Sequence, residues 1–473
     1  MLRHPPIVCV LLALAGCQAQ EGASSVSGSL KTTFVTEGGD RELAFGPEDV
    51  EIAALVPRAG DWQVIDGRID RFGHVTVDDV PAGPYYLRVR AKQEGFYPYF
   101  VSVGTREIEL NSVVLGRPDA VAPTQPTPLT IDGDGLLSWV PGNELHLFSL
   151  GAGAFDSDLE GLAGLRLPET TERISLTVDS AQLRQPRLVD SDSLFITELG
   201  MQTQNRITYL TPVSVLRAGV VVQQDGVPAG IHGSFERITT ATNQLISLKL
   251  NAFAKAEPAV NPMAKVKVYS LSFLADPAGS RRWGGDNLPA VLYAAADATR
   301  TTAVTFPFTA AYRDPNPSER PIKFLAYAQY EIPWLPQWLW PTISNYGPID
   351  PTTELQVALL LSPPLQLQVA GRDASREVTG TGLTPSLRWK APSTGKATLY
   401  EVVVYQQDES GEYALAAALV TDRQDAAIPP GVLVTGRVYV VTVIAMDDRS
   451  PGKPDQPRGA GARATAVTGL LMP

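Results

Sequence analysis

Cysteine and charged side chains are scarce in this sequence, and the basic residues form no cluster. Only two of the 473 residues are cysteine, Cys9 and Cys17, and 19% are charged. Lys and Arg number 39 against 50 Asp and Glu, which gives a formal net charge of -11. Nucleic-acid-binding proteins concentrate Lys and Arg into stripes that face the phosphates. We therefore expect no nucleic acid among the partners.

Histidine is also scarce, which limits metal binding and catalysis. His74, His146 and His232 lie in three separate strand-like segments. A zinc or copper site gathers several imidazoles, carboxylates or thiolates, usually with at least two of them close in sequence. No such spacing occurs, and neither does the Gly-x-Ser-x-Gly pattern of a serine hydrolase. The sequence predicts no metal site, no cofactor and no catalytic residue.

Glycine and proline are abundant, and short alternating runs lie between them. The chain has 40 Gly and 39 Pro, residues that favour turns. Apolar and polar residues alternate over Ile174–Val178, Ile246–Leu250 and Val266–Val268, with the period of a half-buried strand. At roughly 150 residues per domain the length predicts about three domains. We expect a mainly β fold with several β-sandwich domains in tandem.

The first residues have the organisation of an export signal. Arg3 precedes the short apolar run Ile7–Leu14, which ends in Leu14-Ala15-Gly16-Cys17. These four residues resemble the lipobox of bacterial lipoproteins. The resemblance implies that residues 1–16 are removed, that Cys17 carries a lipid, and that this lipid binds a membrane. The alternative is an ordinary secretory signal with a chance cysteine.

The residue after the lipobox bears on the compartment. Gln18 stands where Asp would retain a Gram-negative lipoprotein at the inner membrane, so the resemblance implies the outer membrane, with the periplasmic or cell-surface face left open. Residues 17–29 are small and polar, and we expect them to form a lipidated tether. Cys9 lies in the removed segment. The mature chain therefore has no disulfide and no thiol except the lipidated one.

Residues 30–117 contain two turn-and-strand units. A turn at Gly73 precedes the alternating strand His74–Val77, and a second turn at Pro81–Gly83 leads into Tyr85-x-Leu87-x-Val89. This pattern resembles the carboxypeptidase regulatory-like (prealbumin-like) β-sandwich, which implies a structural or binding module without catalytic residues. The stretch Lys31–Pro47 departs from the compact start of that family, which leaves the first strand open.

Residues 364–470 contain a second familiar pattern. Trp389 follows an early alternating run, Tyr400–Tyr405 forms an apolar strand, and Leu433-x-x-Gly-x-x-Tyr439 precedes another. Together these segments resemble a fibronectin type III domain. The resemblance implies that Trp389 fills the core and that the Tyr439 hydroxyl satisfies a backbone group, as in a tyrosine corner.

The residues between these modules carry no motif of a known family. Residues 118–128 include the proline-rich stretch Pro123–Pro128, and we expect a linker there. Residues 129–353 form a central β-rich region of one large or two medium domains. Within it, Ala290–Arg300 is compatible with a helix, and Ala290–Tyr293 with a strand.

Aromatic residues and prolines are concentrated at Tyr327–Tyr346. Trp334, Trp338 and Trp340 lie within seven residues, with prolines between them. Proline disfavours both helix and sheet, so we expect an irregular or extended loop over the whole stretch. Its rings could close the end of a sandwich as a plug, stack on sugars of the envelope, or insert at a membrane surface. The three tryptophans are the candidate ligand-binding residues.

Three acidic pairs complete the set of candidate sites: Asp132/Asp134, Asp156/Asp158 and Asp190/Asp192. We expect the first in a turn before a strand, with a loose calcium site as the alternative, and the others in solvated loops. The sequence favours a non-catalytic outer-membrane lipoprotein that binds an envelope polysaccharide or a protein partner. The alternative is a polysaccharide-acting hydrolase with carboxylates in the central region. A third possibility is an assembly component that pairs its edge strands with a partner.

Overall fold

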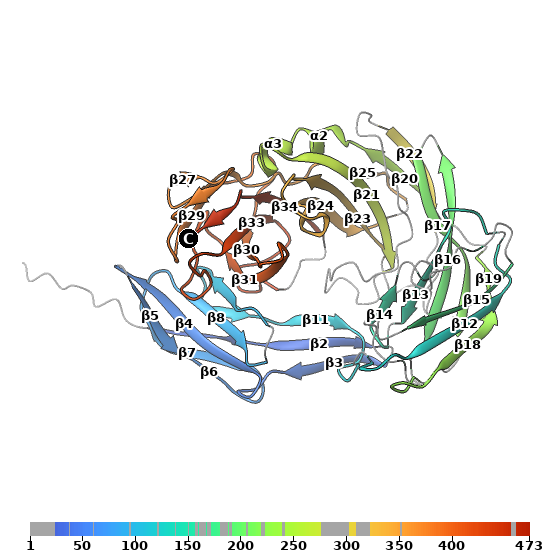
Figure 1. Cartoon of the computed structure of the whole chain (residues 1–473), viewed down its shortest axis with the longest axis horizontal. Helices are drawn as coiled ribbons and strands as arrows, with labels where there is room; N and C mark the ends of the chain where they lie inside the picture. Colours follow the sequence, from blue (N-terminus) through green and yellow to red (C-terminus); the bar gives the residue numbers. More distant parts are fainter. Residues whose placement is uncertain are drawn as a thin grey trace, which may run out of the picture.

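The computed structural model in Figure 1 describes residues 24–473 with gaps. The gaps are residues 37, 60, 94–95, 121–122, 138, 150, 157–158, 160–166, 168–171, 180–187, 189–191, 205–206, 219–222, 239–241, 276–301, 309–321, 351 and 456–459. The predicted signal sequence, Cys17 and the segment Ala290–Arg300 lie outside the described residues.

Strands dominate every described part of the chain, which confirms a mainly β fold with several β-sandwich domains in tandem. Four sandwiches follow one another along the chain, and the polypeptide runs around a closed circuit (Figure 1). The N-terminal sandwich, in blue, lies directly below the C-terminal one, in orange and red. The central region contains two sandwiches.

The N-terminal sandwich encloses a core of Val, Ile, Ala and Leu between two sheets. Val75 and Val77 point inward while His74 points to solvent, as the alternation requires. Gly73 has a φ of 80°, which favours glycine. The strands are β1 (Ser24–Ser29), β2 (Lys31–Thr36), β3 (Gly39–Ala44), β4 (Val50–Arg58), β5 (Asp61–Asp66), β6 (Arg68–Ile69), β7 (His74–Val80), β8 (Tyr86–Ala91), β9 (Tyr99–Ser102), β10 (Glu107–Glu109) and β11 (Ser112–Leu115).

The predicted tether over residues 17–29 is wrong at its C-terminal end. Ser24–Ser29 forms β1, which pairs with β7 on one side and β10 on the other. Val26 is fully buried in the N-terminal core. Small residues allow this close pairing, and an alanine Cβ at Gly28 would lie 1.8 Å from the Ile108 carbonyl oxygen. The small side chains that suggested a flexible segment therefore fit a strand between two neighbours.

Strands β2, β3 and β11 form a separate ribbon that links the N-terminal sandwich to the first central one (Figure 1). Its far end is tied by the Arg117 backbone N–H, which donates to the Gly151 carbonyl at 2.8 Å. This ribbon includes most of the stretch Lys31–Pro47 that departs from the carboxypeptidase regulatory-like pattern.

The first central sandwich packs a three-stranded sheet against a five-stranded sheet. The predicted linker runs along it, and the Thr124 and Thr127 backbone N–H groups donate to Asp225 and Asp179 at 3.0 and 2.9 Å. The strands are β12 (Pro128–Asp134), β13 (Glu144–Ser149), β14 (Ala154–Asp156), β15 (Arg173–Asp179), β16 (Leu194–Gln204), β17 (Ile207–Ala218), β18 (Ala229–Ser234) and β19 (Glu236–Arg237).

The turn expected at Asp132–Gly135 is wrong, because Asp132, Gly133 and Asp134 lie on β12 between β15 and β18. Glycine suits this strand because a Cβ at Gly133 would lie 2.6 Å from the Phe235 ring.

The second central sandwich packs sheet β22-β20-β25 against β21, β23 and β24. Two short helices follow β20, which sequence periodicity did not indicate. The elements are β20 (Thr242–Leu248), α2 (Asn251–Ala254), α3 (Glu257–Val260), β21 (Lys265–Ala275), β22 (Thr302–Phe308), β23 (Ile322–Glu331), the 3-10 helix η2 (Gln337–Leu339), β24 (Thr342–Pro348) and β25 (Leu355–Val357).

The C-terminal sandwich packs a four-stranded sheet against a second sheet. Trp389 is buried against Tyr400, with ring centroids 5.3 Å apart. Tyr439 is fully buried, and its hydroxyl accepts the Val434 backbone N–H at 2.9 Å, as a tyrosine corner requires. The strands are β26 (Leu365–Val369), β27 (Arg372–Asp373), β28 (Val378–Thr379), β29 (Ser386–Lys390), β30 (Leu399–Gln407), β31 (Tyr413–Thr421), β32 (Asp425–Ala427), β33 (Val438–Met446), β34 (Gly461–Val467) and β35 (Leu471–Met472).

One sheet runs through three of the four sandwiches in the order β21-β23-β24-β34-β33-β30-β31-β9-β8-β4-β5. The second central sandwich joins the C-terminal one where β24 pairs with β34, and the C-terminal sandwich joins the N-terminal one where β31 pairs with β9. Residues more than 300 positions apart are therefore neighbours in one ladder.

Buried side chains also join the N-terminal sandwich to the C-terminal one. Phe100 of β9 is buried in the core of the C-terminal sandwich, and Leu399 and Val420 of that sandwich are buried in the N-terminal core. The Tyr86 hydroxyl accepts the Ala427 backbone N–H at 2.8 Å. Shared cores of this kind indicate that the two sandwiches form one packed body.

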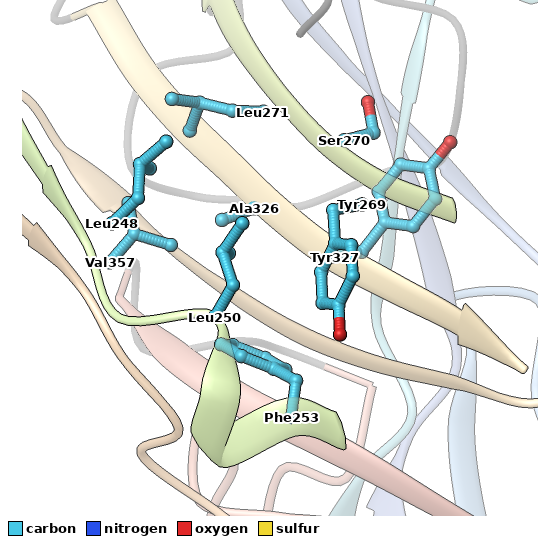
Figure 2. A pocket seen from close by; sticks show the side chains of 9 residues that line it. All are labelled: Leu248, Leu250, Phe253, Tyr269, Ser270, Leu271, Ala326, Tyr327 and Val357. Atoms are coloured by element: carbon cyan, nitrogen blue, oxygen red, sulfur yellow. The ribbon is translucent and has the colours of Figure 1, made fainter. Parts of the chain in front are cut away.

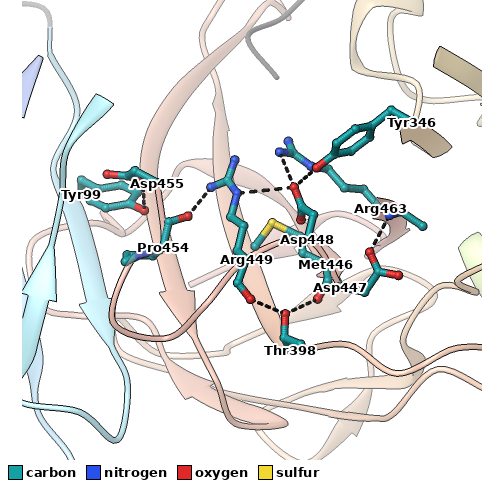
Figure 3. Close-up of polar contacts among 11 residues, drawn as sticks. Tyr99, Tyr346, Thr398, Met446, Asp447, Asp448, Arg449, Pro454, Asp455 and Arg463 are labelled. Atoms are coloured by element: carbon teal, nitrogen blue, oxygen red, sulfur yellow. Dashed lines mark hydrogen bonds and ion pairs between the residues drawn. The ribbon is translucent and has the colours of Figure 1, made fainter. Parts of the chain in front are cut away.

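A buried polar cluster marks the junction of β24 with the C-terminal sandwich (Figure 3). Asp448 is fully buried, accepts a hydrogen bond from the Tyr346 hydroxyl, and lies 3.2 Å from the Arg463 guanidinium. Nearby, the Tyr99 hydroxyl of β9 donates to Asp455 at 2.9 Å. Removal of one partner from a buried ion pair is strongly destabilising, because the other charge then lacks compensation.

Candidate ligand-binding groove

The aromatic segment forms a strand, a short loop and a second strand. Tyr327 and Tyr330 lie on β23, and Tyr346 lies on β24, so the expectation of an irregular segment is wrong at both ends. Only residues 332–341 leave the sheet, and they contain Pro333, Pro336 and Pro341 together with the three tryptophans. The prolines are confined to the connection because β23 and β24 need their backbone N–H groups for pairing.

Buried apolar residues and backbone hydrogen bonds hold this loop in place. Ile332, Leu335 and Leu339 are buried in the core that the second central and C-terminal sandwiches share. The Trp340 indole N–H donates to the Leu335 carbonyl at 3.2 Å, and its ring packs against the same core. Trp334 also packs on this core as a half-buried side chain. Trp334 and Trp340 therefore act in part as the plug that the sequence allowed.

Trp338 differs from its two neighbours because its side chain is 61% exposed. It lies in η2, and its ring meets that of Tyr405 on β30 edge to face, with centroids 6.2 Å apart. The contact with Tyr405 therefore holds the Trp338 ring in place, while most of the ring remains exposed to solvent.

The turn between β30 and β31 faces the aromatic loop and is fixed by one carboxylate. Asp408 accepts hydrogen bonds from the Ser410 hydroxyl at 2.6 Å and from the Glu412 backbone N–H at 2.9 Å. These bonds, first the one from the Ser410 side chain, lower the pKa of Asp408. Gly411 has a φ of 89° and closes the turn. The turn is thus preformed.

A groove of about 340 Å³ lies between the loop and this turn. Its lining combines aromatic rings and prolines with an amide and a carboxylate, the mixture found in small-ligand sites. The lining residues are Pro333, Trp334, Leu335, Pro336, Trp338, Gln407, Gly411, Glu412 and Tyr413.

One acidic side chain lines the groove, and a second lies farther along β30. Glu412 lines it, and Glu401 lies six residues before Gln407 on β30. Burial, and then the charge of Glu401 and the neighbouring Tyr97, raise the pKa of Tyr405 to about 12. The surroundings therefore disfavour an anionic ligand, in keeping with the net charge of -11.

The structure brings Trp334 and Trp338 to the groove and leaves Trp340 outside its lining. Sequence reasoning missed Tyr405, Tyr413 and Glu412, which belong to a different sandwich from the tryptophans. In the sequence these residues appear only as two tyrosines on either side of an Asp-Glu-Ser-Gly turn. That pattern does not show which loop of another sandwich packs beside the turn.

Two carboxylates of the central region, Glu198 and Asp192, occupy buried structural positions. Glu198 on β16 is fully buried and accepts hydrogen bonds from the Ser214 hydroxyl at 2.5 Å and the Leu137 backbone N–H at 3.1 Å. Burial raises its pKa. Asp192 pairs with Arg117 at 2.6 Å. Asp158 and Asp190 lie outside the described residues.

The described residues inside the second central sandwich enclose one small cavity. Leu248, Leu250 and Phe253 meet Tyr269 and Tyr327 around a cavity of about 10 Å³, which is enough for one water molecule (Figure 2). The lining in Figure 2 is mostly hydrocarbon. This space belongs to the packed core.

His74, His146 and His232 lie on β7, β13 and β18, and each is within ion-pair distance of one carboxylate. The described residues contain no group of three potential metal ligands. Among the described helices, none has the length and apolar composition to cross a membrane.

Comparisons with known proteins give no family. No family model matches the chain, and no curated protein matches it. Among solved structures, the FN1–FN3 domains of chicken CNTN1 align over 96% of both chains with 9% identity and a TM-score of 0.15. A tetra-tandem repeat from the extending region of a large adhesion protein covers 94% of this chain and 99% of its own, with 12% identity and a TM-score of 0.12. At these TM-scores the superpositions carry no argument.

Proposed function

We propose that the protein is a non-catalytic lipoprotein of the Gram-negative outer membrane that binds a neutral polysaccharide of the cell envelope. The lipobox-like residues before Cys17 support the anchor. The turn-and-strand pattern of residues 30–117 supports a carboxypeptidase regulatory-like module that serves as a spacer. The observation that carries the binding function is the exposed, fixed ring of Trp338 beside a polar groove.

The groove suits sugars because it combines aromatic faces with hydrogen-bond acceptors. Sugar rings have apolar faces of C–H groups that pack on an indole, while their hydroxyl groups donate and accept hydrogen bonds. Glu412 offers a carboxylate beside the rings of Trp334 and Trp338. A neutral glycan therefore satisfies both parts of the lining.

A proline-rich peptide fits less well, although such peptides bind aromatic grooves. Proline has no backbone N–H, so a proline-rich ligand presents mainly carbonyl acceptors. The carboxylate of Glu412 would then face acceptors and lack a donor. An unpaired acceptor that is buried by a ligand lowers its affinity.

The test is co-sedimentation of the mature chain, without its lipid, on peptidoglycan sacculi, cellulose and chitin. We expect one of these to retain the protein and the Trp338→Ala variant to bind it roughly fivefold to tenfold more weakly, since one aromatic stack contributes about 1 to 1.5 kcal/mol.

The matched control is Phe72→Ala, which removes a ring that is 55% exposed in the N-terminal sandwich, far from the groove in sequence. This variant should bind as the parent does. The proposal fails if none of the three polysaccharides retains the parent, or if the two variants bind equally.

A further inference from the structure

The chain enters the N-terminal sandwich at one of its ends. Ser24 pairs with Val80, the last residue of β7, directly before the turn Pro81–Pro84. The Arg106 guanidinium donates hydrogen bonds to the Ser24 and Val80 carbonyl oxygens at 3.2 and 3.1 Å, and to that of Pro81. One side chain therefore fixes the point at which the chain enters the fold.

The same end of the N-terminal sandwich lies beside the C-terminal end of β31. Strand β9 runs parallel to β31, with Ser102 opposite Thr421. Just beyond both strands, the Gly104 backbone N–H donates to the Asp422 carboxylate at 2.9 Å. The chain then reaches the Arg106 side chain that holds the Ser24 carbonyl. The entry point and the end of β31 are therefore on the same side of the molecule.

The groove lies at the opposite end of β31. One of its walls contains Gly411 and Glu412, which belong to the turn directly before Tyr413, the first residue of β31. From Tyr413 to Thr421 the strand rises by roughly 26 Å at about 3.3 Å per residue. The groove and Ser24 are therefore separated by at least the length of this strand.

The segment between the proposed lipid and the fold is short. Cys17 precedes Ser24 by seven residues, which span at most about 25 Å in any conformation. Ser24 therefore stays within that distance of the membrane that holds the lipid. If the groove faced this membrane, Ser24 would stand roughly 26 Å or more above it, so the segment would have to be fully stretched. Full extension costs conformational entropy.

We propose that the Ser24 end of the N-terminal sandwich is the membrane-facing surface and that the groove opens away from the anchoring membrane. This inference rests on the lipid anchor in the proposed function. The partner of this surface is the phospholipid bilayer, which the exposed turn residues Ala82–Pro84 face. The glycan then reaches the groove from the side opposite the anchor, and glycolipids of the anchoring leaflet are excluded as its ligands.

Energy transfer from the protein to the membrane tests this orientation. The full chain is produced with its signal sequence, and the mass of the mature protein shows whether it is lipidated. The lipoprotein is then added to preformed vesicles of phosphatidylethanolamine and phosphatidylglycerol that contain a rhodamine-labelled lipid. Because the mature chain has no free thiol, Ala82→Cys and Glu409→Cys each provide a single site for a donor dye.

The two labelled sites form a matched pair. Ala82 is exposed in the turn beside the entry point, and the Glu409 side chain, 86% exposed, belongs to the turn beside the groove. We expect at least about twofold more transfer from Ala82→Cys than from Glu409→Cys, since the sites differ in height by about 26 Å. Both changes lie in exposed turns, so both variants should unfold at the thermal midpoint of the parent.

The outcomes separate this inference from the proposed function. Equal transfer from the two sites, or more from Glu409→Cys, overturns the orientation and leaves both the anchor and the glycan groove in place. If the parent carries no lipid or does not bind the vesicles, the proposed anchor fails, and this inference fails with it.

Discussion

Single side chains decide how much of the aromatic loop is core and how much is surface. Trp340 donates its indole N–H to the Leu335 carbonyl within its own loop, and Trp334 packs on the shared core. Trp338 has no such burial and keeps 61% of its surface in water. The loop needs the first two rings for its own stability, which leaves the third free to bind a ligand.

Glu198 provides a prediction at this scale, because its burial makes stability depend on pH. Burial raises its folded pKa above the ordinary 4.5, so the folded state favours the protonated form. Its contribution to stability is full below that value and is lost as the pH rises through the folded pKa. Glu198→Gln keeps an acceptor oxygen but cannot ionise. The variant should therefore gain stability relative to the parent between pH 4 and pH 7.

Urea unfolding midpoints at the two pH values measure this difference. Glu42→Gln removes an exposed carboxylate and controls for the change in net charge. A relative loss of stability by Glu198→Gln as the pH rises would contradict a structural, destabilised carboxylate at this position.

Secondary-structure elements agree with the sequence prediction where neighbouring residues determine them. The turn at Gly73, the alternation of β15 and the tyrosine corner at Tyr439 each depend on residues within a few positions, and the sequence predicted all three. The sequence could not predict that Ser24–Ser29 is a strand, because small residues are equally common in tethers. What decides is the neighbouring strand β10, about 80 residues away.

Gly28→Ala tests that strand. Its Cβ would lie 1.8 Å from the Ile108 carbonyl oxygen, so β1 and β10 must separate. We expect a loss of about 2 kcal/mol or more, seen as a lower thermal midpoint. Gly38→Ala is the control, since its Cβ would meet nothing closer than 3.8 Å. Equal midpoints for both variants would mean that β1 is not part of the fold.

At the scale of the whole molecule, the two ends of the chain join in one sheet, and the proposed binding groove forms where the second central sandwich meets the C-terminal one. The pairing of β9 with β31 joins residues more than 300 positions apart, and no sequence pattern specifies it. The candidate tryptophans were visible in the sequence, but the groove was not, since its second wall belongs to the C-terminal sandwich.

Phe100→Ala tests the closure. Phe100 is 1% exposed and lies on β9 within the C-terminal core. Its loss should cost about 3 to 5 kcal/mol and speed amide hydrogen exchange in β31. Ile131→Ala, in the core of the first central sandwich, should destabilise that sandwich without changing exchange in β31. Unchanged exchange in β31 of Phe100→Ala would show that the two ends fold independently.

The central claim, that Trp338 contacts a glycan, is tested most directly by oxidative footprinting with mass spectrometry. The mature chain is oxidised alone and when bound to the polysaccharide that retains it, and each tryptophan is followed separately. We predict that Trp338, the one exposed tryptophan among the described residues, oxidises readily in the free protein and is protected in the bound protein, while Trp62 is unchanged. Equal oxidation of Trp338 in both states would contradict the account.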